Sequence, residues 1–269
     1  MNAWSREDII IAYALYCVTP LGKINPSNKV IQQVAEIIPH SVASIVMRMR
    51  NFRYIDPKVS SGLKNVAKAD RMIYEEFKHD WGSLSLEAET LTGLAIFDSS
   101  PLQGAKPLSS LTNHGRVSRE RHFFKQAVLA AYDDRCFISG CALPQMLVAS
   151  HIKPYSQCRS EADRVSPDNG ICLNTFYDKA FDRGLITITP SMKIYVSPII
   201  LDSPQDAFTA RWLASLDGMV LPPPPDFRRV ESFWSTITTK FLGGSHEYSN
   251  LCSVFCRPKT DRPEYRRAA

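Results

Sequence analysis

The sequence predicts an α+β protein: an N-terminal helical domain, then a ββα unit with a helical C-terminal extension. Three observations favour this class. Apolar residues recur at helical spacing through the first fifty residues. Two short apolar runs then flank a polar loop that ends in an Asn-Gly turn, and an amphipathic segment follows the second run. With 269 residues, 44% of them apolar, the chain can form one or two domains with their own cores.

Composition narrows the class of protein further. Charged residues make up 22% of the chain, which is typical of a folded protein, and the net charge of +5 permits polyanion partners without requiring them. No apolar run approaches the roughly 18 residues of a membrane span, so we expect no membrane partner. The first residues lack the pattern of a signal peptide, which favours a cytoplasmic protein with mostly reduced cysteines.

Residues 1–97 are predicted to form a helical, DNA-binding domain. Helices are expected over residues 5–18, from residue 29 to the proline at 39, over 41–52 and over 67–79. Ser5 is the expected N-cap of the first of these helices. Short helices joined by tight turns resemble a helix-turn-helix module.

Basic residues concentrate on the third predicted helix and its exit. From residue 48 to residue 71 there are seven Lys and Arg against two Asp, a surplus of five that equals the charge of the whole chain. We therefore expect Arg48, Arg50 and Arg53 to contact DNA phosphates. The alternative is that this face is simply solvated.

Residues 98–117 lack clear periodicity and are predicted to be a linker, with a second domain over 118–269. That domain begins with a helix at 118–132 and a short strand within 133–141. Strands at 147–152 and 171–173 and a helix from 174 or 175 to 181 form the ββα unit. A hairpin over 185–196 and amphipathic segments at 206–216 and 228–242 complete the prediction.

Four polar residues stand at the junctions of the ββα unit. His151 ends the first strand, and Asn169 lies in the turn that enters the second, where its amide can hold the turn. Asp178 and Asp182 are four residues apart, so their carboxylates share one face of the helix. Two carboxylates suit a hard divalent ion such as Mg²⁺, and a neutral histidine beside it can accept a proton from water.

Three blocks carry a family resemblance: Ala149-Ser150-His151-Ile152-Lys153-Pro154, Asn169-Gly170-Ile171-Cys172-Leu173, and the stretch from Tyr177 to Ile186. In this order and spacing, over about residues 120–200, the chain resembles the HNH endonucleases, in particular a bacterial restriction-type branch. The resemblance implies a ββα-metal fold that cuts DNA phosphodiesters. It implies His151 as general base, Asn169 as the residue that positions it, and Asp178 and Asp182 as metal ligands.

Two positions depart from the family pattern. Ser150 stands where many members have a further metal ligand, and Tyr177 and Asp178 stand near the place of the last histidine. Carboxylate ligands favour Mg²⁺, with Mn²⁺ as an alternative, over catalytic Zn²⁺. Two carboxylate ligands leave coordination positions of the metal ion for water and DNA phosphate.

The remaining expectations concern partners and role. Lys153, Arg164 and Arg183 are candidate phosphate contacts, with a solvated charge as the alternative for each. Double-stranded DNA is the expected substrate. A double-strand cut needs two sites or two visits, which favours a homodimer. A structural zinc site is disfavoured because its cysteines lack the usual C-x2-C spacing: Cys136, Cys141, Cys158 and Cys172. We expect a restriction or phage-defence nuclease; the alternatives are a non-catalytic DNA-binding protein and a ligand-activated effector nuclease.

Overall fold

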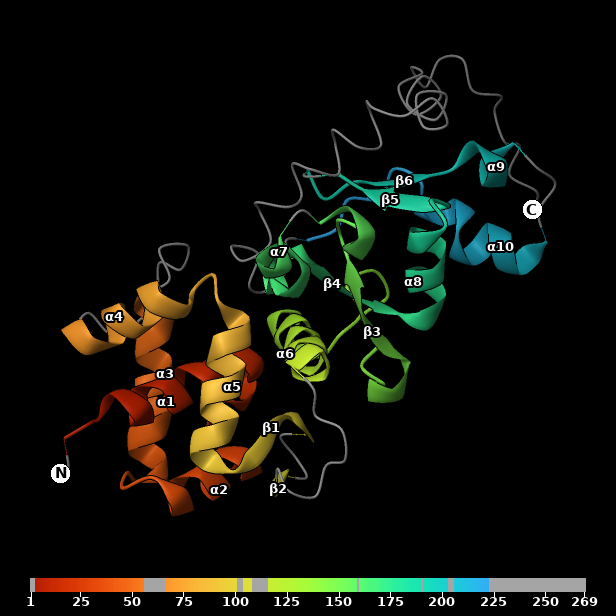
Figure 1. Cartoon of the computed structure of the whole chain (residues 1–269). Helices are drawn as coiled ribbons and strands as arrows, with labels where there is room; N and C mark the ends of the chain where they lie inside the picture. The colour runs from red at the N-terminus through yellow and green to blue at the C-terminus, as the bar shows by residue number, and fades with distance from the viewer. Residues whose placement is uncertain are drawn as a thin grey trace. The chain divides into compact units, whose positions relative to one another are not determined.

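The protein is α+β, as predicted, and its described residues divide into two compact units (Figure 1). The first unit runs to Thr175 and the second from Phe176 to Pro222. The computed structural model describes residues 3–55, 66–100, 104–107, 116–158, 160–189, 191–202 and 206–222. The predicted segments at 228–242 and 257–269 lie outside these ranges.

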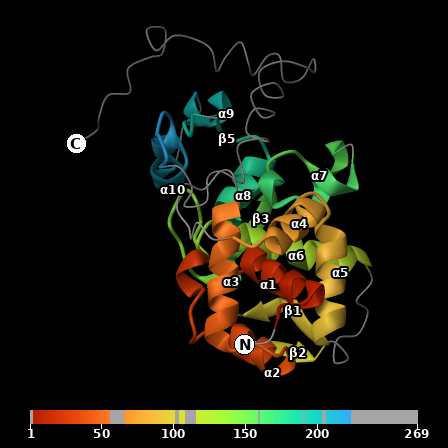
Figure 2. The same ribbon diagram turned by 90° about the vertical axis from the view of Figure 1, so that its left-hand side faces the viewer.

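Helix α1 is the centre of the first unit's core. Its ten residues from Ile9 to Val18 are all buried, and Ser5 forms a capping box with Asp8 at its start. Four helices pack around α1: α3, α4, α5 and α6 (Figure 2). The helices of this unit are α1 Arg6–Val18, α2 Lys29–Ile37, α3 Val42–Ile55, α4 Lys68–Phe77, α5 Trp81–Thr92, α6 Arg116–Ala131 and α7 Glu161–Val165.

The predicted helices α1 to α4 and α6 are therefore present, whereas α5 was not predicted. No single helix of the described ranges is long and apolar enough to cross a membrane; α2 and α3 meet that test only as a pair, with a 111° bend between them.

Two strands occupy part of the predicted linker. Strand β1, Leu94–Ser100, pairs antiparallel with β2, Gly104–Pro107. The side chain of Gln33 from α2 bonds the edge of β2, accepting from the Ala105 amide and donating to the Ala105 carbonyl. The domain boundary itself stays a prediction. Helix α6 packs on α1 and α5 as well as on β3 and β4, so the two predicted domains share this helix.

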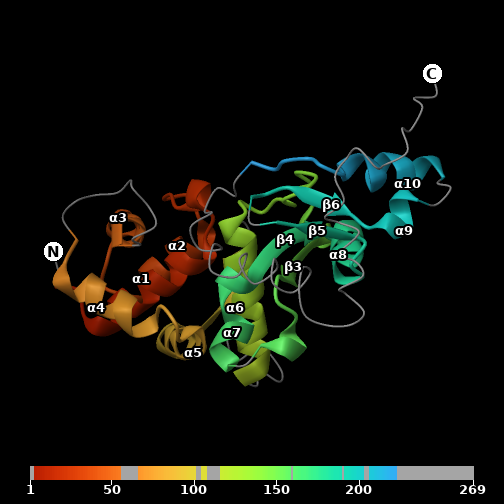
Figure 3. The ribbon, with the colours of Figure 1, turned by 90° about the horizontal axis from the view of Figure 1, so that it is seen from above.

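The hairpin of the ββα unit consists of β3, Leu147–His151, and β4, Gly170–Asn174. The register is antiparallel and pairs His151 with Gly170 at one end. Figure 3 shows α6 beside this hairpin. The approach requires a glycine: a Cβ on Gly170 would overlap Val128 Cγ2 and lie 3.1 Å from Phe124 Cζ of α6.

The predicted short strand within residues 133–141 is wrong, because this segment is a series of turns. Asp133 and Asp134 both have left-handed backbone angles, with φ of 54° and 52°, which ends α6 and breaks any extended run. The Cys136 amide then donates to the Cys141 carbonyl and closes the next turn.

The second unit contains most of α8, Thr175–Asp182, which follows β4 directly in the chain. Gly184, with φ of 65°, ends α8 in the left-handed conformation expected at this position. The predicted hairpin is formed by β5 and β6, and Phe176 of α8 meets Phe208 of α10 edge to face at 5.2 Å. The other elements are β5 Ile186–Ile188, β6 Ile194–Val196, α9 Pro198–Leu201 and α10 Ala207–Trp212.

We predict that Gly170→Ala lowers the free energy of unfolding by about 1–3 kcal/mol, because the added methyl group overpacks the contact between β4 and α6. Gly22→Ala is the matched control, since the nearest atom to its Cβ is 4.0 Å away. Urea unfolding of both variants measures the difference. Equal stability of the two variants would contradict the tight approach of α6.

Candidate active site around His151

His151 is held at the end of β3 by aromatic neighbours. Its ring stacks on Phe124 of α6, with centroids 4.2 Å apart and planes 11° apart. Tyr155, in the loop after β3, presents an edge contact at 5.8 Å, and the Arg164 guanidinium lies over the Tyr155 ring. The imidazole is half-buried in this arrangement. Packing thus fixes the plane of the ring.

A backbone carbonyl fixes the protonation pattern of the ring. His151 Nε2 lies 2.8 Å from the carbonyl oxygen of Arg164. A carbonyl can only accept a hydrogen bond, so Nε2 carries the proton and, in the neutral ring, Nδ1 carries the lone pair. This tautomer is the form that a general base at Nδ1 requires.

Asn169 is fully buried and clamps the loop that follows His151. Its Oδ1 accepts from the Lys153 amide at 2.7 Å, and its Nδ2 donates to the carbonyls of Lys153 at 3.1 Å and Asp163 at 3.2 Å. The same Nδ2 lies 3.4 Å from Cys158 Sγ. Burial raises the pKa of the Cys158 thiol, which keeps the sulfur neutral at physiological pH. Asn169 therefore positions the loop rather than contacting the imidazole.

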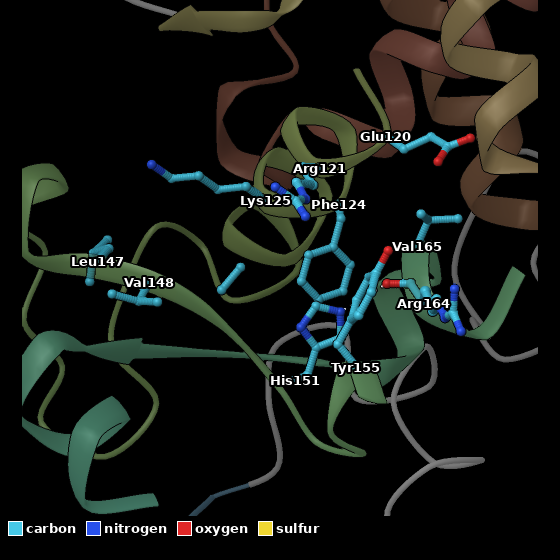
Figure 4. A pocket seen from close by; sticks show the side chains of 11 residues that line it. Glu120, Arg121, Phe124, Lys125, Leu147, Val148, His151, Tyr155, Arg164 and Val165 are labelled. Carbon is cyan, nitrogen blue, oxygen red and sulfur yellow. Dashed lines mark hydrogen bonds between the residues drawn. The ribbon is translucent and has the colours of Figure 1, made fainter. Parts of the chain in front are cut away.

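A cavity of about 330 Å³ opens beside His151 (Figure 4). Helix α6, strand β3, the loop after it and helix α7 form its walls. The lining includes both aromatic neighbours of His151 and two cations of α6, Arg121 and Lys125. Its residues are Glu120, Arg121, Phe124, Lys125, Leu147, Val148, Ala149, His151, Tyr155, Arg164 and Val165.

The predicted metal ligands lie in the second unit. Asp178 is half-buried in the first turn of α8, and Asp182 is exposed as the last residue of that helix. Their spacing places both on one helix face. Carboxylate oxygens are the kind of donor that a hard cation prefers. Within the described ranges no group of three or more His, Cys, Asp or Glu side chains is arranged to hold a metal. The convergence of His151 with Asp178 and Asp182 stays a prediction.

The other predicted phosphate contacts occupy different settings. Lys153 is half-buried, with Nζ 4.0 Å from Asp163 Oδ2, and its backbone is held by Asn169. Arg183 is exposed just after α8. Both roles remain predictions.

The basic face of α3 has structural partners. Arg48 forms an ion pair with the buried Asp70 and stacks over the Trp4 ring at 4.2 Å. Burial lowers the pKa of Arg48 and raises that of Asp70, while their ion pair opposes both shifts. Arg50 donates to the Ile24 carbonyl, and Arg53 is half-buried. DNA contact by these three arginines stays a prediction; Lys58 and Lys64 of the same basic stretch lie outside the described residues.

Three residues of the site were not predicted from the sequence: Phe124, Tyr155 and the backbone carbonyl of Arg164. Phe124 belongs to a helix that precedes the motif blocks, and its buried position looks like ordinary core packing. Every residue has a backbone carbonyl, so the residue type at position 164 does not predict this hydrogen bond. The glycine of the Asn-Gly pair was the one sequence signal for this contact. Without a side chain, Gly170 lets α6, which carries Phe124, approach the strand closely.

The chain order is a histidine at the end of one hairpin strand, a buried asparagine before the next strand, and a helix with two carboxylates. Residues 136–189 match the model of a protein family described as HNH endonuclease. The match covers β3, β4, α8 and β5, and it confirms the predicted resemblance to the HNH endonucleases over this segment. No curated protein and no solved structure matches the chain.

We predict that Asn169→Asp loosens the loop from Lys153 to Asp163, because a carboxylate cannot donate to the two carbonyls that the amide now satisfies. Each buried group left without a partner costs about 1–3 kcal/mol of unfolding free energy. Hydrogen exchange should quicken at the Lys153 amide. Asn174→Asp, at the other end of β4, is the control; equal exchange in both variants would contradict the clamp.

We predict that Asp70→Ala lowers the free energy of unfolding by about 3 kcal/mol, since it leaves the Arg48 charge in a buried setting without its carboxylate. Adding Arg48→Met should recover part of this loss, because the buried charge is then removed as well. Urea unfolding of the wild-type chain, the two single variants and the double variant gives the interaction free energy of the pair by a double-mutant cycle. A double variant that is the least stable of the three would refute the buried pair.

Proposed function

We propose that this protein is a metal-dependent endonuclease that hydrolyses phosphodiester bonds of double-stranded DNA. The HNH domain is that of a nuclease, and a nuclease acts on nucleic acid. The observation that carries the finer proposal is the geometry of His151. Its Nε2 proton is committed to the Arg164 carbonyl, and its ring lines a cavity beside α6.

In the proposed mechanism, His151 Nδ1 accepts the proton of the attacking water. The Phe124 stack and the Arg164 carbonyl hold the ring, so little reorientation is needed when the ring becomes charged. The resulting imidazolium keeps its Nε2 hydrogen bond to the carbonyl. Asn169 acts indirectly: it holds the loop that carries Tyr155, and Tyr155 contacts the imidazole ring.

Asp178 and Asp182 would hold the divalent ion, most simply Mg²⁺, with Mn²⁺ as a substitute. When bound, such an ion supplies charge stabilisation at the phosphate and the leaving oxygen. The two carboxylates provide hard oxygen donors, and water and phosphate oxygens would complete the coordination.

The biological part of the proposal is a restriction or phage-defence nuclease acting in the cytoplasm. It rests on the motif resemblance to the restriction-type branch of the family. A homodimer would supply two active sites for a double-strand cut.

We predict that His151→Ala lowers the rate of plasmid cleavage in Mg²⁺ by about 10²–10⁴-fold, because the general base is lost. His79→Ala, which removes an exposed imidazole from the same chain, should cleave at the wild-type rate. Agarose gels of supercoiled plasmid over time measure both. Wild-type cleavage by His151→Ala would overturn the assigned role.

The metal assignment is tested in the same assay with Asp178→Asn and Asp182→Asn. Each should raise the Mg²⁺ concentration needed for half-maximal cleavage, and a chelator should abolish cleavage by the wild-type chain. Cleavage that persists in chelator would contradict metal dependence, and cleavage absent with every divalent ion would favour a non-catalytic DNA-binding role.

A further inference from the structure

Helix α6 carries two cations on the wall of the His151 cavity. Arg121 and Lys125 are exposed and lie one turn apart, while Phe123, Phe124 and Ala127 of the same helix are buried. Both cations line the cavity that contains His151 (Figure 4). Residues four apart on a helix have Cβ atoms about 5–6 Å apart, so the two charges act on one surface.

These two cations have no hydrogen-bond or ion-pair partner within the described part of the chain. Other basic side chains of the first unit form ion pairs: Arg48 with Asp70, Lys23 with Asp134, and Arg6 with two glutamates of α4 and α5. A positive pair that no carboxylate neutralises is available to an external anion.

The acid that shares the cavity does not neutralise the pair. Glu120 is buried, and its carboxylate faces α5: a Cβ on Gly82 would lie 2.8 Å from Glu120 Oε1. In Figure 4 the Glu120 carboxylate points away from the Lys125 ammonium group. The charge presented beside His151 is therefore positive.

The loop after β3 offers a second kind of contact in the same cavity. Tyr155 is 42% exposed, although its ring is braced by the Arg164 guanidinium on one face. An exposed aromatic ring backed by a cation suits the apolar face of a sugar or base. Two cations from α6 and a braced aromatic ring from the loop after β3 match the chemistry of a polynucleotide strand.

We propose that Arg121 and Lys125 of α6 form the backbone-binding surface that holds a DNA strand against His151. Both precede the segment that matches the HNH family, so this surface lies outside the matched domain. Neighbouring phosphates of one strand follow at about 3.4 Å along the duplex axis, within the span of two long side chains one helical turn apart. The inference rests on the proposed function and extends it by naming the residues that bind substrate.

The test measures binding apart from cleavage. A fluorescent duplex DNA probe is titrated with the full chain in chelator, over a salt series from about 50 to 200 mM. Arg121→Gln combined with Lys125→Gln removes both charges and keeps most of each aliphatic stem. Loss of two phosphate contacts should reduce the slope of log K against log salt by about 1.8 and weaken binding about equally for all sequences.

The matched control is Lys29→Gln combined with Lys106→Gln. These residues are also exposed, lie on α2 and β2 of the same unit, and fall outside the basic stretch predicted from the sequence. Removing the same charge there should leave the slope near the wild-type value. Thermal unfolding of both double variants verifies that each folds.

Every outcome is decisive for the proposal. A reduced slope for the α6 variant alone supports it. An unchanged slope for the α6 variant, an equal reduction in both variants, or no DNA binding by the wild-type chain overturns it. Plasmid cleavage in Mg²⁺ distinguishes failure of the α6 surface from failure of the endonuclease proposal. If the wild-type chain cleaves plasmid and the α6 variant keeps the wild-type salt slope, only the α6 surface is rejected. If DNA binding depends on α6 but the wild-type chain does not cleave, only the endonuclease proposal is rejected.

Discussion

The buried side-chain amide of Asn169 is the interaction on which the geometry around His151 depends. It uses its acceptor and both donor directions on a loop that would otherwise leave several backbone groups unsatisfied. Ordering such a loop costs conformational entropy. The hydrogen bonds of the buried Asn169 amide offset part of this cost. Because Tyr155 sits in this loop and Arg164 just beyond it, the position of the imidazole follows from the amide.

Helix α6 connects this local geometry to the rest of the first unit. Its buried side meets α1 and α5 as well as the β3–β4 hairpin, and Phe124 reaches from it to the imidazole. Gly170 makes the approach possible, because any larger residue would push the helix away from the strand. The Asn-Gly pair thus serves two purposes: asparagine holds the loop and glycine admits the helix.

Elements with strong local signals were predictable from the sequence. Helix α2 has a distinct apolar face and an asparagine N-cap, and α1 has a serine N-cap. The ββα unit has its Asn-Gly pair and its glycine after α8. Elements determined by tertiary packing were missed. Helix α5 has apolar residues without a distinct face, and β1–β2 depends on the Gln33 side chain, which is distant in sequence. The partners of His151 were missed for the same reason, and the pairing of Arg48 with Asp70 joins residues of two different helices.

In the proposed metal centre, the imidazole and the two α8 carboxylates meet at one cation. Mn²⁺ is paramagnetic and broadens the NMR signals of nearby protons, so the ring-proton signals of His151 report its proximity without any need for cleavage. We expect Mn²⁺ to broaden these signals in the wild-type chain and to leave them sharp when Asp178→Asn and Asp182→Asn are combined. Ring signals that stay sharp in the wild-type chain with Mn²⁺ bound to α8 would contradict a shared metal centre.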